Sequence, residues 1–305
     1  MTVAPESTRY GAPIMASDAL RLARGYLGLT KPRILLLVIF TGLPVLWMAA
    51  GRTPSLAVSV AILGGTALAA AAANTLNCYI ERERDGLMER TRMRPLPSAQ
   101  VRPAQALAFG LALGGLATAI LYVSGGALAA GLGVASILFY VFVYTVWLKP
   151  RSPLNAVVGG AAGAAAPLIA DAAVNGHVGP AGWLLFLIIF FWQPPHVWAI
   201  ALFRKDDYAK AGIPMLPNVI GDQPTRWRML WYTLALVPVT LAPLPLGLLG
   251  PLYGAAAFGL GAWFVWHAVR VLRERDDAAA RRMFHVSLLY LFALFGAMLV
   301  DLALR

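Results

Sequence analysis

The stretch LAVSVAILGGTALAAAAANTLNCYIERERDG, Leu56 to Gly86, changes character abruptly near its end. The residues from Leu56 to Ile80 include no charged side chain, and the next five residues, Glu81 to Asp85, are all charged. An apolar run of about twenty residues is long enough to cross the ~30 Å hydrocarbon core of a bilayer as a helix. The stretch therefore predicts a membrane-spanning helix that ends in a charged segment at the membrane boundary.

The composition of the whole chain points to the same environment. Hydrophobic residues make up 59% of its 305 residues, charged residues make up 13%, and the mean hydropathy is +0.69. A typical soluble domain is nearer half apolar and a quarter charged. The alternating pattern of a membrane β-barrel is absent from the sequence, so helices are the structures that can span the bilayer. We expect an all-α polytopic membrane protein, and its single cysteine, Cys78, excludes an intramolecular disulfide.

Apolar runs of similar length recur along the chain and predict nine membrane-spanning helices. They cover residues 33–50, 55–78, 104–123, 127–147, 155–174, 182–203, 229–248, 253–272 and 284–304. Residues 31–305 form a single transmembrane domain on this interpretation, and residues 1–30 form a polar N-terminal arm. The arm lacks the pattern of a secretory signal peptide, and we expect its first 15 residues to be disordered.

The basic residues lie in alternate connectors between the predicted spans. Of the 25 lysines and arginines, 23 fall in the N-terminal arm or in the connectors on the same side of the membrane, and the exceptions are Arg52 and Arg305. Positive residues stay on the cytoplasmic side, so the N-terminus is expected inside and the C-terminus outside. The net charge of +11 is thereby explained by basic residues that set the membrane topology and contact anionic lipids. Nucleic acid is excluded as a partner.

The first candidate site lies where the second predicted span ends. Asn77, Glu81 and Asp85 are spaced four residues apart and therefore line one face of a continuing helix. Oxygen-bearing side chains in this arrangement suit Mg²⁺ bound together with substrate phosphates, and Arg90 and Arg94 supply donors for phosphate oxygens. A solvated helix end with ordinary ion pairs would account for the arginines, but not for carboxylates on the side of the membrane where acid is otherwise scarce.

A second acidic cluster follows the sixth predicted span, on the same side of the membrane. Asp206 and Asp207 lie there beside Lys205 and Lys210. Two clusters of this kind suit a metal-bridged diphosphate, with the metal between acid and phosphate and with cations neutralising the leaving group. The presence of two such clusters therefore favours a role for both in binding a diphosphate.

Two further titratable residues lie within predicted spans. His196 follows Pro194 and Pro195, which predict a kink in the sixth span and a cavity beside it. A histidine inside an apolar span is a functional candidate, although a structural histidine bonded to a freed carbonyl remains an equal alternative. Asp171 lies near the outer end of the fifth span, where it would line a cavity or simply lie close to the membrane interface.

Several of these segments resemble one family of proteins. Asn77-x-x-x-Glu81-x-x-x-Asp85 resembles the NxxxDxxxD motif of the UbiA superfamily of intramembrane prenyltransferases. Within it, the chain resembles the protoheme IX farnesyltransferase (heme O synthase) family in four segments: NCYIERERD with RTRMRPL at residues 77–96, YTVWLKPRSPLNAVVGG at 144–160, WQPPHVW at 192–198, and DDYAKAGIPMLP at 206–217. The chain departs from the family pattern at Glu81 and Glu83, where aspartate is usual.

The resemblance implies a ring of nine helices around a central cavity, in the bacterial cytoplasmic (inner) membrane and open to the cytoplasm. It implies Mg²⁺-dependent transfer of the farnesyl group of farnesyl diphosphate to heme B, giving heme O. Asn77, Glu81, Asp85 and Asp207 would hold the metal, and Asp206 would take part in catalysis. The implied substrate-binding residues are Arg82, Arg90, Arg94, Tyr144, Lys149, His196, Lys205 and Lys210, with His196 at the heme iron or a propionate.

Two other functions stay open at this point. Another UbiA-type enzyme, acting on an aromatic acceptor in quinone biosynthesis, would share the fold and the diphosphate site. A transporter of ions would place its acidic residues nearer the middle of the membrane, whereas most of those in this chain lie at the predicted cytoplasmic boundary. A heme A synthase and a second copy of the chain are candidate partners that the sequence leaves open.

Overall fold

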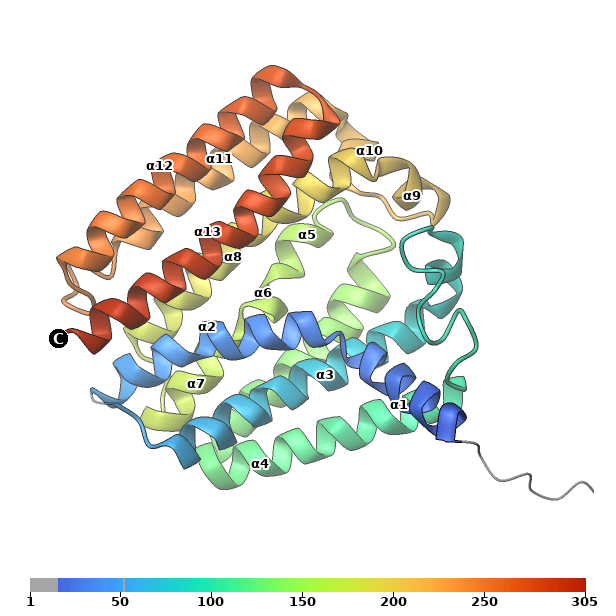
Figure 1. Ribbon diagram of the computed structural model, residues 1–305, viewed down its shortest axis with the longest axis horizontal. Helices are drawn as coiled ribbons and strands as arrows, with labels where there is room; N and C mark the ends of the chain where they lie inside the picture. The colour runs from blue at the N-terminus through green and yellow to red at the C-terminus, as the bar shows by residue number, and fades with distance from the viewer. Residues whose placement is uncertain (1–15, 52) are drawn as a thin grey trace, which may run out of the picture.

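The computed structural model describes residues 16–51 and 53–305, and this part of the chain is helical without strands (Figure 1). The predicted disorder of residues 1–15 lies outside the described residues. The elements are α1 Ala16–Thr30, α2 Pro32–Ala50, α3 Leu56–Leu87, α4 Pro103–Leu138, the π-helix η1 Phe139–Leu148, α5 Asn155–Val158, α6 Gly160–Gly163, α7 Ala165–Asn175, α8 Pro180–Phe203, α9 Lys205–Lys210, α10 Leu216–Ile220, α11 Asp222–Leu241, α12 Pro251–Glu274 and α13 Asp277–Ala303. The all-α membrane fold predicted from the composition is confirmed.

Helix α3 carries the charged segment beyond the apolar run. It begins at the N-cap Ser55, whose hydroxyl accepts a hydrogen bond from the Val58 amide, and it continues for 32 residues to Leu87. At about 1.5 Å per residue such a helix is longer than the hydrocarbon core is thick, so its last turns reach past the membrane boundary. The segment Glu81–Asp85 is therefore helical, as the four-residue spacing predicts.

The third and fourth predicted spans lie in one continuous helical segment, α4 followed by η1. Its backbone breaks at Gly126, where φ is 78° and ψ is −178°. A Cβ at Gly133 would lie 2.7 Å from the Leu121 side chain, and one at Gly114 would lie 3.8 Å from Ile137. Because these residues lie on opposite sides of Gly126, the segment folds back there as a hairpin of two helices.

Seven helical segments of the described residues are long and apolar enough to cross a membrane. The hairpin at Gly126 is counted once among them, as Pro103–Leu148. The seventh predicted span, 229–248, falls on α11 only as far as Leu241, and residues 242–248 form turns instead. Helix α11 is not among the seven because its first turns, DQPTRWR, are polar. The number nine therefore remains a prediction.

The fifth predicted span is broken, whereas the sixth is continuous. Residues 155–175 form three short helices, α5, α6 and α7, joined at Gly159 and Ala164. Glycine-rich sequence weakens a helix, since glycine loses the most backbone entropy on folding. Helix α8, in contrast, stays helical through Pro194 and Pro195.

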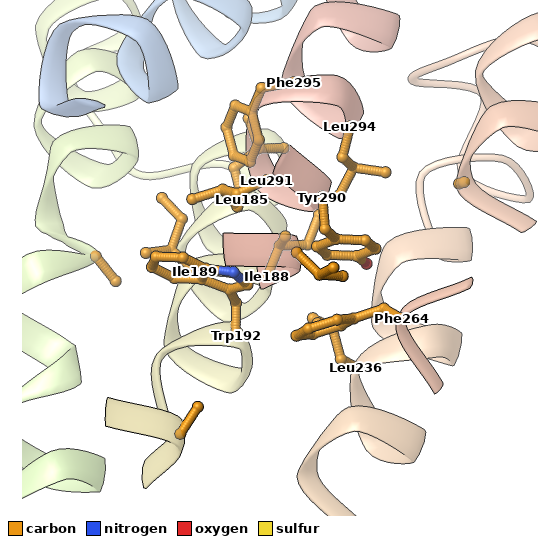
Figure 2. Close-up of a cluster of buried hydrophobic side chains, with 14 of the residues drawn as sticks. Leu185, Ile188, Ile189, Trp192, Leu236, Phe264, Tyr290, Leu291, Leu294 and Phe295 are labelled. Atoms are coloured by element: carbon orange, nitrogen blue, oxygen red, sulfur yellow. The ribbon is translucent and has the colours of Figure 1, made fainter. Parts of the chain in front are cut away.

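The largest hydrophobic core joins α8 to α11, α12 and α13 (Figure 2). The rings of Phe264 and Tyr290 stack with their centroids 4.6 Å apart, and the Trp192 indole donates a hydrogen bond of 2.8 Å to the Ser287 carbonyl. Buried aromatic side chains of this size dominate core energetics. This packing fixes α8 against α13.

Asp171, for which the sequence left two readings, lies buried and binds the start of α8. Its carboxylate accepts hydrogen bonds from the amides of Gly179 and Gly182, both at 2.9 Å, and from the Asn175 side chain at 2.7 Å. Asp301 binds the amides at the start of α12 in the same way. Both carboxylates satisfy amides that a helix N-terminus leaves unpaired, and they favour its dipole.

Helix α1, the connector 88–102 and helices α9 and α10 lie at one end of the bundle, and the C-terminus lies at the opposite end (Figure 1). Leu29 of α1 packs with Cys78 and Leu96 in a small core at the first of these ends. Part of the predicted N-terminal arm is thus a helix packed on the domain. The division of the chain at residue 30 stays a prediction.

Candidate functional site

The last turns of α3 present Asn77, Glu81 and Asp85 toward the interior of the bundle. Their exposed fractions are 2%, 3% and 1%, so both carboxylates are buried despite lying near the end of a helix. Carboxylates are almost never fully buried unless they are paired. The neighbouring Glu83 points away from this face and is exposed, as the helical spacing predicts.

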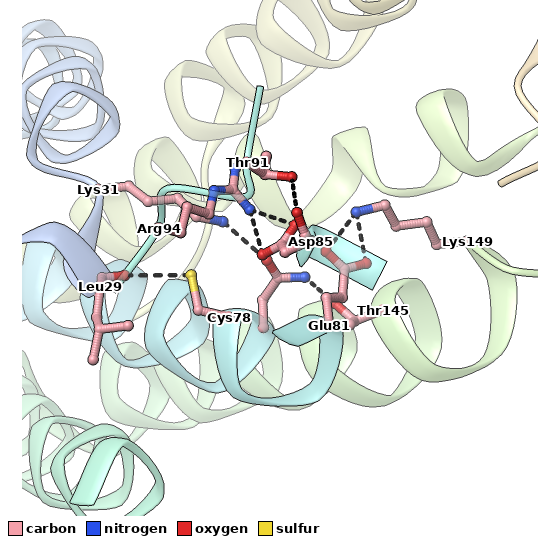
Figure 3. A network of polar contacts seen from close by, with 10 residues as sticks. Leu29, Lys31, Cys78, Glu81, Asp85, Thr91, Arg94, Thr145 and Lys149 are labelled. Atoms are coloured by element: carbon pink, nitrogen blue, oxygen red, sulfur yellow. Dashed lines mark hydrogen bonds and ion pairs between the residues drawn. The ribbon is translucent and has the colours of Figure 1, made fainter. Parts of the chain in front are cut away.

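A different cation binds each of these three side chains (Figure 3). Lys31 Nζ donates to Asn77 Oδ1 at 2.9 Å. Lys149 Nζ lies 2.6 Å and 2.7 Å from the two carboxylate oxygens of Glu81. Arg94 Nη1 donates to both oxygens of Asp85, at 2.9 Å and 2.8 Å.

The three cations come from separate parts of the chain. Lys31 joins α1 to α2. Its backbone is in the left-handed conformation, with φ at 56°, which is unusual for a residue other than glycine. Arg94 lies in the connector after α3, and Thr91 ties this connector to α3 through a 2.8 Å hydrogen bond to the Asp85 carbonyl. Strain held at Lys31 is typical of functional sites.

Lys149 is positioned by the π-helix η1. Its amide bonds to the carbonyl of Tyr144, five residues earlier, at 2.8 Å. Thr145 lies on the same helix and accepts a 3.0 Å hydrogen bond from Asn77 Nδ2. A π-helix is rare and is found most often at functional sites, where it changes which side chains face a neighbour.

The electrostatics of this network are those of buried, mutually paired charges. Burial lowers the pKa of Lys31, and the nearby charges of Arg94 and Lys149 lower it further. Burial alone would also lower the pKa of Lys149, but the Glu81 carboxylate outweighs it and raises that pKa. Asp85 does the same for Arg94. Lys149 and Arg94 therefore stay charged, and the site offers cationic donors beside carboxylate oxygens.

An apolar cavity of about 210 Å³ adjoins this network. It is lined by residues of α2, α3, α4, η1, α5 to α8 and α13. Asn74, one turn before Asn77, and Tyr144, whose ring centre lies 5.7 Å from Lys149 Nζ, belong both to the lining and to the surroundings of the network. The cavity is mostly apolar with few polar groups, as is usual for small-molecule sites.

The second acidic cluster lies on α9, the short helix after α8. Tyr208 of α9 packs with Met88, which follows α3, so the two clusters belong to neighbouring elements. The Asp207 side chain is 12% exposed, and its Oδ2 is buried with no hydrogen bond in the described structure, 3.9 Å from Arg204 Nη1. Asp206 is exposed.

The oxygen atoms of these residues fit a divalent cation only together with a substrate. In residues 16–51 and 53–305, no three His, Cys, Asp or Glu side chains lie close enough to hold a metal by themselves. The buried, unpartnered Oδ2 of Asp207 is an available ligand, and Asn77, Glu81 and Asp85 offer others. Mg²⁺ commonly takes few protein ligands and completes its octahedron with phosphates and water.

Five of the predicted substrate-binding residues lie outside the network. Arg82 binds the Tyr79 carbonyl at 2.8 Å, and Lys205 pairs with Asp222 at 3.1 Å. Arg90 and Lys210 are exposed. His196 belongs to α8, and its side chain contacts α13, where its Nδ1 is 2.7 Å from Ser287 Oγ.

Lys31 is the member of the network that the sequence reasoning missed. It was assigned only to the set of basic residues on one side of the membrane. Its position directly before an apolar run was the available signal, because a lysine there can reach the end of a neighbouring span. What the sequence could not supply was the contact with Asn77, 46 residues away.

Comparisons with known proteins agree on one family. Residues 35–295 match the model of the UbiA prenyltransferase family. Protoheme IX farnesyltransferase of Acidiphilium cryptum is 49% identical over 92% of this chain and 90% of its own length, and that of Gloeobacter violaceus is 47% identical over 90% and 91%.

Solved structures agree on the fold. That of digeranylgeranylglyceryl phosphate synthase covers 93% of this chain and 99% of its own, with a TM-score of 0.78 and 17% identity. That of an Archaeoglobus fulgidus UbiA homolog, bound to DMAPP and Mg²⁺, covers 90% and 99%, with a TM-score of 0.65 and 19% identity.

Proposed function

The chain belongs to the UbiA prenyltransferase family, and from this we propose that it transfers the farnesyl group of farnesyl diphosphate to a vinyl group of heme B, giving heme O. The observation that carries the proposal is the buried network of Lys31, Arg94 and Lys149 with two carboxylates, which adjoins an apolar cavity. A prenyl diphosphate has the same two parts, a charged head and an apolar tail.

In this assignment the diphosphate binds at the end of α3. Arg94 and Lys149 donate hydrogen bonds to phosphate oxygens, and their raised pKa values keep them charged while they do so. Lys31 adds a third donor from the other side of Asn77. Asn77, Glu81, Asp85 and Asp207 would hold Mg²⁺ together with the phosphates, and the ion would supply additional positive charge beside the leaving group.

The reaction requires the bond between farnesyl C1 and the diphosphate oxygen to break, with the electron pair leaving on pyrophosphate. The cationic side chains stabilise this developing negative charge, which lowers the barrier. A vinyl carbon of heme B then forms the new carbon–carbon bond, and water adds to the resulting cation and loses a proton. The apolar walls of the cavity, including Leu37 and Ala73, shield the allylic cation from water until the bond has formed.

The same assignment places the site at the cytoplasmic side of a bacterial inner membrane, with the C-terminus outside. The distribution of basic residues supports this orientation. The opposite positions of α1 and the C-terminus in the bundle are compatible with it (Figure 1). Labelling of a cysteine introduced at Arg305, with a reagent that does not cross the membrane, tests the orientation in intact cells.

The direct test is purified protein in lipid nanodiscs with farnesyl diphosphate, heme B and Mg²⁺, with the products identified by mass spectrometry. Formation of heme O and pyrophosphate is expected, and it should stop when a chelator removes Mg²⁺. Prenylation of 4-hydroxybenzoate without heme O would assign the chain to the quinone-type enzymes. Movement of an ion or anion across sealed vesicles without either product would favour a transporter.

A further inference from the structure

His196 is held on both faces and at one of its two nitrogens. Its ring stacks against Trp192, with centroids 4.6 Å apart, and against Phe284, at 4.8 Å. Its Nδ1 lies 2.7 Å from the hydroxyl oxygen of Ser287. The residue is nonetheless partly exposed. Nε2 has no hydrogen bond within the described residues and is not among their fully buried unpartnered polar atoms, so this nitrogen is accessible.

The Ser287 hydroxyl determines which nitrogen of His196 carries the proton. Its Oγ lies 2.6 Å from the carbonyl oxygen of Phe284, which can only accept a hydrogen bond. The hydroxyl proton must lie between Ser287 Oγ and the Phe284 carbonyl oxygen, since without it two oxygen lone pairs would repel each other at this distance. The hydroxyl oxygen is then an acceptor toward His196, so Nδ1 carries the proton and donates it.

With the proton on Nδ1, the neutral imidazole presents a lone pair at Nε2. A heme propionate is a carboxylate and needs a donor, so it gains nothing from this lone pair. A heme iron is a Lewis acid and takes the lone pair of a neutral imidazole as an axial ligand. The geometry therefore favours a contact of His196 with the heme iron over a contact with a propionate, the two possibilities that the sequence left open.

We infer that His196 Nε2 is the ligand of the heme iron and that Ser287 is the positioning residue that sets its tautomer and ring orientation. The inference rests on the proposed function and specifies how that site holds its acceptor substrate. Histidines that bind metals generally donate their other nitrogen to an oriented partner, and loss of this partner weakens metal binding by about 10- to 100-fold. Ser287 is itself fully buried, and its carbonyl is fixed by the Trp192 indole at 2.8 Å.

The test compares two porphyrins that share both propionates but differ in iron. Heme B and metal-free protoporphyrin IX are titrated into the full chain in nanodiscs, without farnesyl diphosphate, and binding is followed by absorbance and fluorescence. His196→Ala and Ser287→Ala should each weaken heme B binding and change its Soret spectrum, by about tenfold or more in affinity for Ser287→Ala. Neither should change the affinity for protoporphyrin IX.

Two further variants separate positioning from packing. Ser287→Thr keeps the hydroxyl and should keep the heme B spectrum. Ser124→Ala removes a serine that likewise donates to a carbonyl of its own helix, Ile120 at 2.7 Å, but contacts no histidine, and it should change neither porphyrin affinity.

Equal losses for the two porphyrins in His196→Ala would mean that the residue contacts a propionate or only the ring, and would overturn the iron assignment. Equal losses of heme B affinity in Ser287→Ala and Ser287→Thr would overturn the positioning role. Retained protoporphyrin IX binding shows in each case that the variant is folded. The proposed function fails separately, if the wild-type chain binds heme B but forms no heme O.

Discussion

The ammonium nitrogen of Lys149 lies 2.7 Å from Oε2 of Glu81, although the two residues are 68 positions apart in the chain. The contact joins the end of the π-helix to the last turns of α3; the Glu81 side chain is 2% exposed and the Lys149 side chain 15%. It offers a reason for the glutamate at a position where the motif that this segment resembles has aspartate. The extra methylene of glutamate moves the carboxylate outward by about 1.5 Å, toward a cation held on the neighbouring helix.

Breaking this pair from either side should destabilise the fold. Glu81→Gln leaves the Lys149 charge buried without a counter-charge, and loss of one partner of a buried pair costs about 3–5 kcal/mol. Lys149→Met leaves the Glu81 charge unpaired in the same way. We expect each variant to lower the melting temperature, and the double variant to recover part of the loss. A double-mutant cycle on thermal unfolding in detergent measures this coupling, and purely additive losses would contradict it.

The two acidic clusters should respond differently to loss of charge. Asp85→Asn removes the partner of Arg94 and should reduce both stability and turnover. Asp207→Asn removes a carboxylate whose Oδ2 has no hydrogen bond, so it should leave the melting temperature near that of the wild type. If Asp207 binds the metal, turnover still falls by about 100-fold or more, partly recovered at high Mg²⁺. Glu83→Gln, on an exposed side chain, is the control and should change neither quantity.

The position of the oxygen-bearing side chains could be predicted from the sequence because it depends only on helix geometry. A spacing of four residues places Asn77, Glu81 and Asp85 on one face whatever surrounds the helix. Their cationic partners depend on how α2, η1 and the connector after α3 pack around that face. Arg94 was predicted from the basic run that follows the helix, and Lys149 from the family motifs. Lys31 was not identified, because no local pattern connects it to Asn77.

Other differences also come from tertiary context. The fifth predicted span is apolar apart from Asn155 and Asp171, and its hydropathy gives no sign that the helix breaks at Gly159 and Ala164. The role of Asp171 could not be read from the sequence, because its amide partners belong to the start of the next helix. The kink expected at Pro194 and Pro195 stays a prediction: α8 is continuous through both residues, and a cavity lies beside this part of the helix, lined by Trp192 and Gln193.

Removing the Asp171 carboxylate should affect stability rather than chemistry. Asp171→Ala leaves the buried amides of Gly179 and Gly182 without acceptors, and each unsatisfied buried group costs about 1–3 kcal/mol. Asp171→Asn keeps one acceptor oxygen and should cost less. Thermal unfolding measures both effects, and the KM for farnesyl diphosphate should stay at the wild-type value. A changed KM with an unchanged melting temperature would mean that Asp171 acts in the site.

Substrate affinity should depend on pH through Lys31. Burial lowers the pKa of this side chain, so it loses its proton at a lower pH than an exposed lysine does. Because only the protonated form is a cationic donor to phosphate, the affinity for a non-reactive farnesyl diphosphate analogue should fall as pH rises through this lowered pKa. Lys31→Arg stays charged over the same range and should flatten the decline. Identical pH profiles for the two proteins, measured by calorimetry, would show that titration of Lys31 does not cause the decline.

The glycines of α6 should set the length of the isoprenoid that the cavity accepts. A Cβ at Gly160 would lie 2.7 Å from Oε1 of Gln193, so in Gly160→Ala the amide must shift, and Gln193 lines the cavity. A displaced side chain that shortens the cavity should penalise farnesyl diphosphate relative to geranyl diphosphate by about tenfold in kcat/KM, the scale of one misfitted methylene. Gly259→Ala is the matched control, because a Cβ at that position of α12 meets no atom within 4 Å. An equal loss of kcat/KM for both diphosphates would mean that the isoprenoid does not lie beside Gln193. A displaced Gln193 can disfavour the longer substrate only if the isoprenoid chain reaches it.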